Sequence, residues 1–133
     1  MSIALFFITH EGIASNLLNI GENIIQKEND NLAYHEVAMD ADIDKSIENI
    51  EAKLSTLKLD KGVLFISDIY GSTPSNIAEK MAEKYHSHLI NGVNLPMVIR
   101  LLNYRDQTEQ SLLEKALAGA RKGIQHSIPK SNH

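Results

Sequence analysis

The chain has 133 residues, of which 43% are apolar, and its 17 acidic residues against 13 Lys and Arg give a formal net charge of −4. This length favours a single domain over residues 1–133, with enough apolar residues for a buried core. Because the sequence has no cysteine, it excludes a disulfide scaffold, a thiol nucleophile and an iron–sulfur cluster. Proteins that bind nucleic acid usually carry the opposite charge balance, so we expect no nucleic-acid partner.

The chain opens with a short apolar run, SIALFFI, that has no basic residue before it and is followed at once by polar residues. The run is too short for a signal peptide or a membrane span, and its composition indicates a buried strand. We therefore expect a cytoplasmic protein.

Short apolar runs alternate with helical patterns in the first half of the chain. Strands are predicted at Ile3–Ile8 and at Leu32–Met39, the second being more polar and so nearer a sheet edge. Between them, apolar residues at three-to-four spacing mark one helix: Ile13, Leu17, Leu18, Gly21, Ile24 and Ile25. After a break at residues 29–31 and the second strand, the same spacing predicts a helix from about Asp42 to Leu57.

The second half continues the alternation. Gly62–Ser67 is apolar without alternation, as expected of a strand that is covered on both faces. A helix over residues 77–85, a short strand at His88–Asn91 and a short helix from Leu95 to about Asn103 follow, and a helix over residues 112–124 comes last. Residues beyond it could add one short edge strand.

This alternation predicts an α/β fold with three layers, in which helices cover both faces of a four-stranded parallel sheet. Right-handed crossovers and a central first strand give the strand order 2-1-3-4. Ligands of such sheets bind outside the carboxyl ends of the strands, where the strand order reverses. The segments that reach this point are residues 9–12, 67–74 and 91–96.

His10 and Asp68 end two strands that are neighbours in this order. Taken alone, His10 could equally be a residue that caps a loop. A carboxylate at its Nδ1–H would fix the ring tautomer, leave a free lone pair on Nε2 and stabilise a cationic ring. A histidine that acts as a nucleophile needs these three properties.

The segment from Tyr70 to Asn76, YGSTPSN, has the composition of a turn that leads into a helix. Pro74 suits the first helical turn, Thr73 the N-cap before it, and Gly71 allows close approach of the backbone. The helix start would direct N–H groups outward and form an anion cradle with the hydroxyls of Ser72 and Thr73. The motif alone also describes many ordinary turns.

A second turn that leads into a helix, residues 92–97, could form a wall of the same crevice or could be an ordinary loop without a functional role.

The other polar clusters in the sequence are explained by ordinary structural roles rather than by metal binding. The spacing of Asp40, Asp42 and Asp44 resembles part of a calcium loop but lacks its glycine, and we expect helix capping there. His86 and His88 have no third ligand and should form a solvated pair, so no metal site is predicted. Three further histidines are expected at the surface: His35, His126 and His133.

The chain resembles the IIA domain of the mannose/fructose-type phosphoenolpyruvate-dependent sugar phosphotransferase system over essentially its whole length. Three segments carry the resemblance: IALFFITHEG, KGVLFISDIYGSTPSNIA and INGVNLPMVIRLLNYR. It implies that His10 accepts phosphate from the histidine-containing phosphocarrier protein and passes it to a IIB component, with Asp68 as the ring's partner and residues Gly71 to Thr73 at the phosphoryl group. Four more residues would wall the site or contact a partner protein: Thr9, Asn94, Pro96 and Met97.

The resemblance also implies a homodimer that exchanges a C-terminal strand, no cofactor, and contact with the membrane only through a IIC/IID complex. Glu11 departs from the family, which often has glycine directly after the histidine, and a carboxylate there should repel a phosphoryl group unless it points to solvent. The sequence ends at His133 without a linker or IIB domain. We therefore expect a free-standing component, whose output would be sugar uptake or regulation.

Two other functions are compatible with these residues. A related phosphohistidine subunit serves dihydroxyacetone kinase, although the segments around Ser67–Asn76 and GVNLPM favour the sugar system. A flavodoxin-like module could instead hold the phosphate of a flavin at residues 71–73. This module would need aromatic stacking, for which the chain has no tryptophan and only Tyr70 well placed.

Overall fold

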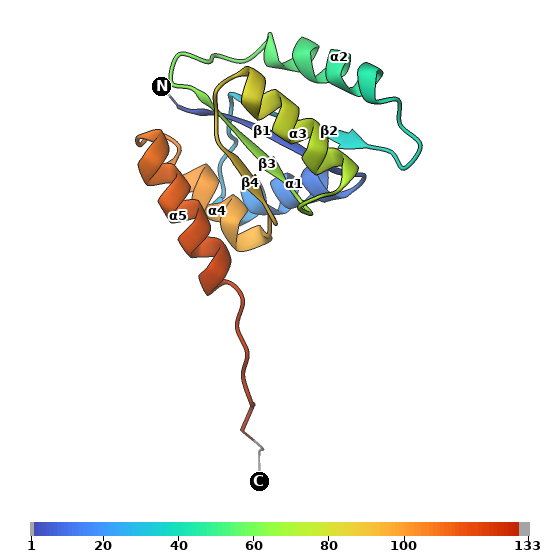
Figure 1. Cartoon of the computed structure of the whole chain (residues 1–133). Coiled ribbons are helices and arrows are strands. Elements are labelled where there is room, and N and C mark those ends of the chain that lie inside the picture. Colours follow the sequence, from blue (N-terminus) through green and yellow to red (C-terminus); the bar gives the residue numbers. More distant parts are fainter. Residues whose placement is uncertain (1, 131–133) are drawn as a thin grey trace.

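The computed structural model describes residues 2–130 and shows a four-stranded parallel sheet between two layers of helices (Figure 1). The strands are β1 (Ala4–His10), β2 (Leu32–Val37), β3 (Val63–Ser67) and β4 (Leu89–Asn91). They lie in the order β2-β1-β3-β4, and every neighbouring pair is parallel. The predicted fold class and strand order are confirmed.

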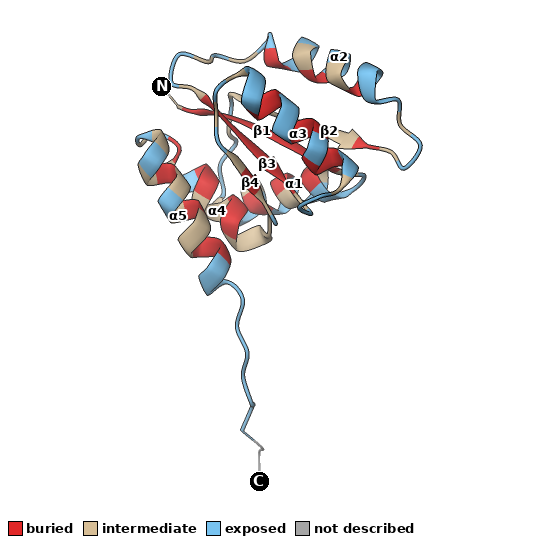
Figure 2. Ribbon diagram, viewed as in Figure 1, coloured by how far each residue is buried: buried red, intermediate tan, exposed pale blue. Residues whose placement is uncertain are grey.

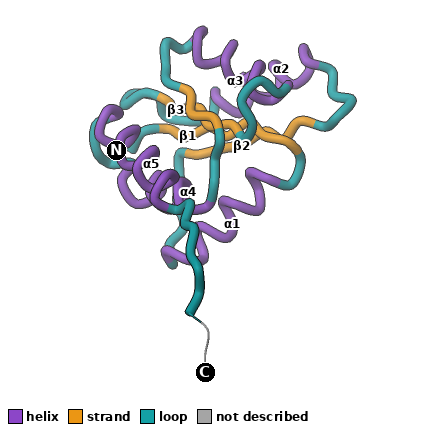
Figure 3. The backbone as a smooth tube through the Cα atoms, turned by 60° about the horizontal axis from the view of Figure 1, so that its bottom comes forward, coloured by secondary structure: helices purple, strands orange, loops and turns teal. Residues whose placement is uncertain are grey.

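Two helical layers enclose the sheet (Figures 1 and 3). One face is covered by α1 (Ile13–Ile25), α4 (Leu95–Tyr104) and α5 (Glu109–Lys122). The other is covered by α2 (Ile43–Leu54) and α3 (Thr73–Lys84). All five predicted helices are present.

The central strands are buried on both faces, which Figure 2 shows as red ribbons. Side chains alternate across a strand, so β1 contributes to both cores. One core, under α1, α4 and α5, includes the residues Ile3, Leu5 and Phe7. The other, under α2 and α3, includes the residues Ala4, Phe6 and Ile8. Full burial of the Ile, Leu and Phe side chains among them contributes about 1.5–3 kcal/mol each, so β1 is a rigid support for the residue at its end.

Helix α1 turns most of the predicted stripe, but not all of it, toward the core. Its buried residues are Ala14, Leu18 and Gly21, whereas Ile24 is 53% exposed. The reason is close packing on α4, because a Cβ atom at Gly21 would lie 2.9 Å from Cγ1 of Val98. Gly21 therefore allows the two helices to approach closely, while Ile13 and Ile24 of the stripe remain at the surface.

Several smaller predictions can be judged from the described residues. The Asp42 side chain accepts from the Lys45 amide at 3.2 Å, which confirms the expected cap of α2. His35 is half-buried rather than at the surface, and burial followed by the charge of Lys53 lowers its pKa. Among residues 2–130, no group of three His, Asp or Glu side chains could hold a metal ion. His133 lies outside the described residues.

The chain leaves α5 as an extended segment (Figure 1). Residues 123–130 form no strand in the single chain, so the predicted edge strand is not seen there. Ile124 is 77% exposed and Ile128 88% exposed. Within residues 2–130, no helix has both the length and the apolarity needed to cross a membrane.

Candidate functional site

The site lies at the carboxyl edge of the sheet, where β1 ends between β2 and β3. His10 is the last residue of β1, and Asp68 directly follows β3. The His10 side chain is 34% exposed, whereas that of Asp68 is only 9% exposed. The His10 ring is therefore accessible to a reactant from solvent, while the more buried Asp68 carboxylate holds the ring in place.

One carboxylate oxygen fixes the histidine in two ways. Oδ2 of Asp68 lies 2.8 Å from Nδ1 of His10 and also accepts from the His10 backbone N–H at 2.9 Å. The other oxygen, Oδ1, accepts from the Ile69 backbone N–H at 3.0 Å. A carboxylate next to Nδ1 selects the tautomer with hydrogen on that nitrogen, so Nε2 keeps its lone pair. The structure thus brings together the two residues predicted to act as a pair.

Asp68 stays ionised although its side chain is partly buried. Burial favours its neutral form, but hydrogen bonds from the His10 backbone and ring outweigh this and lower the pKa of Asp68 below its ordinary value. At neutral pH the group is a carboxylate, which can stabilise a positive charge on the ring.

Thr9 anchors the histidine from within the core. Its side chain is fully buried, its hydroxyl donates to the His10 carbonyl at 2.8 Å, and it accepts from the Ala14 N–H at 3.1 Å. Because its side chain is buried, Thr9 does not reach the surface that a partner protein would contact. It instead connects the end of β1 to the start of α1.

Glu36 of β2 caps α1 from the neighbouring strand, and the sequence analysis missed it. Gly12, at the N-cap position, has no side chain for this role and adopts a φ of 84°. The Glu36 carboxylate accepts from the Ser15 N–H at 2.8 Å and from the Ser15 hydroxyl at 2.7 Å. Burial raises the pKa of Glu36, but these bonds outweigh it and lower the pKa overall. Only the register, which pairs Thr9 with Glu36, reveals this contact.

The turn into α3 differs by one residue from its prediction. Ser72, and not Thr73, is the N-cap: its hydroxyl accepts from the Ser75 N–H at 3.4 Å and donates to the Ile69 carbonyl at 2.7 Å. The Ser75 hydroxyl in turn donates to Oδ1 of Asn91 at 2.7 Å. Thr73 is exposed, and its hydroxyl has no hydrogen-bond partner among residues 2–130. Of the predicted phosphate-binding hydroxyls, Thr73 alone is free to bind an anion.

A small cavity of about 130 Å³ adjoins the histidine. It is lined by His10, Val37, Ala38, Met39, Thr73 and Pro74. Sites for drug-sized ligands usually measure about 300–1,000 Å³, so this cavity is too small for a flavin ring and suits a group of a few atoms. The β2–α2 connection was not among the predicted site segments, because its path over the strand end cannot be read from composition.

The second predicted wall lies elsewhere. Asn94 caps α4 by accepting from the Met97 N–H at 3.0 Å, and it donates to the Ala120 carbonyl at 3.1 Å. Met97 is buried, and Pro96 packs against Gly123 at the end of α5. Asn94 and Met97 line a separate cavity beside α5 that does not include the histidine. The helix cap and α5 engage them, and they are not among the residues that line the His10 cavity. Their role in contact with a partner protein stays a prediction.

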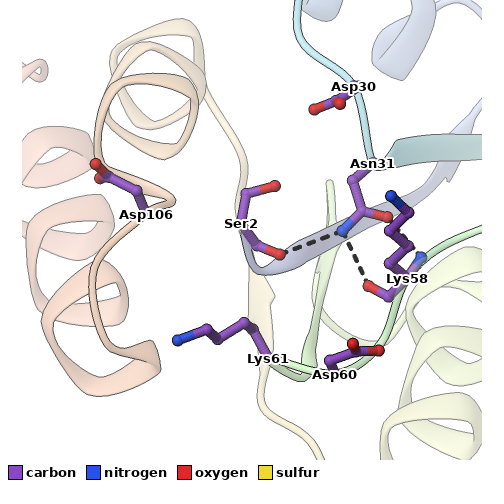
Figure 4. Close-up of a pocket in the computed structure, with 7 residues that line it drawn as sticks. All are labelled: Ser2, Asp30, Asn31, Lys58, Asp60, Lys61 and Asp106. Atoms are coloured by element: carbon purple, nitrogen blue, oxygen red, sulfur yellow. Dashed lines mark hydrogen bonds between the residues drawn. The ribbon is translucent and has the colours of Figure 1, made fainter.

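A larger hollow of about 310 Å³ lies at the opposite, amino-terminal edge of the sheet (Figure 4). Its lining is entirely polar and carries both signs of charge: Ser2, Asp30, Asn31, Lys58, Asp60, Lys61 and Asp106. The Asn31 side chain closes part of it by donating to the carbonyls of Ser2 and Lys58. None of its residues belongs to the His10 site.

The sequence of the chain matches a known protein family. The model of the family described as "PTS system fructose IIA component" matches residues 4–117. The mannose-specific EIIAB component of the sugar phosphotransferase system from Escherichia coli K12 is 32% identical over 127 residues, which cover 93% of this chain and 39% of that protein. The chain thus spans about two fifths of the length of the curated relatives it matches.

Solved structures show the same fold. The mannose/sorbose-specific IIA subunit from Enterococcus faecalis has a TM-score of 0.84 at 19% identity, covering 99% of this chain and 100% of that one. A phosphotransferase-system permease structure from Klebsiella pneumoniae has a TM-score of 0.75 at 26% identity, with coverage of 95% and 91%.

Proposed function

Because the chain belongs to the family of IIA components of the phosphoenolpyruvate-dependent sugar phosphotransferase system, we propose that it carries a phosphoryl group on Nε2 of His10. One observation supports this most strongly: the Asp68 carboxylate occupies Nδ1 at 2.8 Å, so Nε2 is the ring nitrogen left for a reactant. The donor would be the histidine-containing phosphocarrier protein and the recipient a IIB component, both in the cytoplasm. A membrane would be reached only through a IIC/IID complex.

The proposed transfer conserves charge between two imidazoles. The Nε2 lone pair attacks phosphorus, the donor's P–N bond breaks, and its electron pair returns to the donor ring as a neutral imidazole. The His10 ring then carries the positive charge, with hydrogen retained on Nδ1. Asp68 stabilises that charge, and the protein's other task is to hold the two nitrogens in line with phosphorus.

Uptake of phosphate tests this proposal. The chain, incubated with phosphoenolpyruvate, Enzyme I and the phosphocarrier protein, should gain one acid-labile phosphate by mass spectrometry. Offering the phosphorylated chain to IIB proteins and to a dihydroxyacetone kinase subunit then identifies the recipient. We expect transfer to a IIB protein, and transfer to the kinase subunit alone would replace the sugar-system assignment.

Thr73 should contribute more to transfer than Ser72. Thr73→Val keeps the shape of the side chain but removes the free hydroxyl beside His10, and one lost hydrogen bond to a charged group lowers the transfer rate about tenfold to a hundredfold. Ser72→Ala removes the helix cap and should instead lower the free energy of unfolding by about 1 kcal/mol. Single-turnover transfer and urea unfolding measure the two effects. The reverse pattern would show that Ser72 holds the phosphoryl group.

We also propose that the chain forms a homodimer through its C-terminal segment. The exposed Ile124 and Ile128 support this, since an extended tail gains from burying such side chains against a second copy. Sedimentation at micromolar concentration should show a dimer, and a chain truncated after Gly123 should be monomeric. A monomeric full-length chain would contradict the proposal.

A further inference from the structure

The turn that leads from His10 into α1 has little restraint of its own. Asp68 holds the His10 ring and its backbone N–H, which fixes the histidine on the side of β3. On the other side, Gly12 has a φ of 84° and no side chain that could cap the helix. Glycine has more backbone freedom than any other residue. The path of the chain after His10 therefore depends on how the start of α1 is held.

Two side chains hold the start of α1. The buried Thr9 hydroxyl donates to the His10 carbonyl at 2.8 Å and accepts from the Ala14 N–H at 3.1 Å. The Glu36 carboxylate accepts from the Ser15 N–H at 2.8 Å and from the Ser15 hydroxyl at 2.7 Å. Thr9 and Glu36 are register partners on β1 and β2. The turn is thus tied to two neighbouring strands.

The same bonds occupy N–H groups that an anion would otherwise bind. The first N–H groups of a helix have no partner within the helix and attract anions. In α1, those of Ala14 and Ser15 are taken by Thr9 and Glu36. Glu36 is ionised at neutral pH, because hydrogen bonds from Ser15 outweigh its burial and lower its pKa, so it repels a phosphate at this helix end. The start of α3, where Thr73 borders the histidine's cavity, has no such carboxylate cap.

We propose that Glu36 is a positioning residue for phosphoryl transfer, whose carboxylate fixes the turn after His10 and keeps the phosphoryl group away from the start of α1. The inference rests on the proposed function. Glu36 bonds to Ser15 and does not line the His10 cavity, so it acts through the turn and not on the reacting atoms. Transfer is sensitive to such positioning, because a displacement of about 1 Å can lower a rate about 10²-fold.

Glu36→Ala tests the proposal in single-turnover transfer at increasing concentrations of the phosphocarrier protein. We expect the rate at saturation to fall about tenfold to a hundredfold. The half-saturating donor concentration should stay unchanged, because Glu36 acts on His10 and not on the donor. Glu36→Gln should lose less than about threefold, since its carbonyl oxygen can still accept from the Ser15 N–H.

Glu22→Ala is the matched control. Glu22 lies near the other end of α1, and its carboxylate accepts from the Asn29 N–H at 3.0 Å. Both alanine variants lose one negative charge and a bond to a backbone N–H, so both should lower the urea midpoint. Glu22→Ala should nevertheless transfer close to the parental rate. Equal loss in both variants, or a parental rate in folded Glu36→Ala, would overturn the proposal.

Phosphoramidate, a small donor that loses ammonia as its phosphoryl group bonds to Nε2, distinguishes positioning from contact with the protein donor. Because Glu36 positions His10 itself, Glu36→Ala should lose a similar factor with either donor. A loss confined to the protein donor, or a raised half-saturating concentration, would make Glu36 a docking residue and overturn the proposal.

Ser15→Ala keeps the test valid if Glu36→Ala does not fold. It removes only the hydroxyl bond to Glu36 and should slow transfer about threefold to tenfold, as expected for one hydrogen bond to a charged group. A folded Ser15→Ala chain with the parental rate would then contradict the proposal. Failure of the proposed function looks different, because the parent chain would take up phosphate from neither donor.

Discussion

We expect His10→Ala to take up no acid-labile phosphate from the phosphocarrier protein, a complete loss within detection. Alanine removes the only imidazole at the carboxyl edge that Asp68 orients, and no other group of the small cavity is a nitrogen nucleophile. His88→Ala is the matched control, since His88 is exposed and precedes β4 at the opposite edge of the sheet. Intact-mass spectrometry before and after acid treatment measures the label.

The fold should tolerate this change, because the His10 side chain is one-third exposed and lies outside both cores. An unchanged circular dichroism spectrum would establish that. Label that persists in folded His10→Ala would assign the phosphate to another residue and refute the site.

The second large effect is expected from Asp68→Asn, which should slow transfer into His10 about 10²–10³-fold. Asparagine can still accept from Nδ1–H, but it lacks the negative charge that stabilises a cationic ring, and its amide can turn a donor toward the ring and favour the wrong tautomer. In serine proteases, replacing the aspartate that orients the catalytic histidine by asparagine lowers the rate about 10⁴-fold. We expect less here, since His10 need not shuttle protons repeatedly. Quench-flow of the first turnover measures the rate.

The pH dependence of stability gives an independent check on Asp68. Its pKa is lower in the folded protein than its ordinary value of 3.8, so its ionised form stabilises the fold above that value. This contribution disappears as pH falls through the lowered pKa. The difference in unfolding free energy between the parent and Asp68→Asn should therefore shrink in acid.

A folded Asp68→Asn chain that transfers phosphate at the parental rate would contradict the proposed role of Asp68 in transfer. The carboxylate would then act only as a structural cap.

The pairing of His10 with Asp68 could be predicted because it depends only on topology. Each residue ends a strand, the strands are adjacent in the order 2-1-3-4, and parallel strands end at the same edge. Apolar runs and helical spacing were sufficient for that order. The same reasoning located the turn at Gly71 but shifted its N-cap by one residue, because serine and threonine are both good caps.

Contacts that depend on register or on loop paths were not predictable. Glu36 reaches Ser15 only because β2 pairs with β1 in a particular register. The sequence predicts Met39 at the end of a strand, yet β2 ends at Val37 and Met39 of the following connection lines the cavity of His10. The resemblance implies a place for Asn94 beside the site, whereas a hydrogen bond to α5 holds its side chain beside that helix. The hydrogen-bond partner is 21 residues away in the sequence for Glu36 and 26 residues away for Asn94.

The identity of the ring nitrogen that bears the phosphoryl group decides whether Asp68 orients His10 for transfer. Long-range ¹H–¹⁵N correlation spectra of the phosphorylated, ¹⁵N-labelled chain distinguish the two ring nitrogens of His10. We expect phosphorus on Nε2 and a hydrogen on Nδ1 that is held by Asp68, as the 2.8 Å contact in the free protein requires. Phosphorus on Nδ1, or an imidazole that is unchanged while the chain carries phosphate, would contradict it.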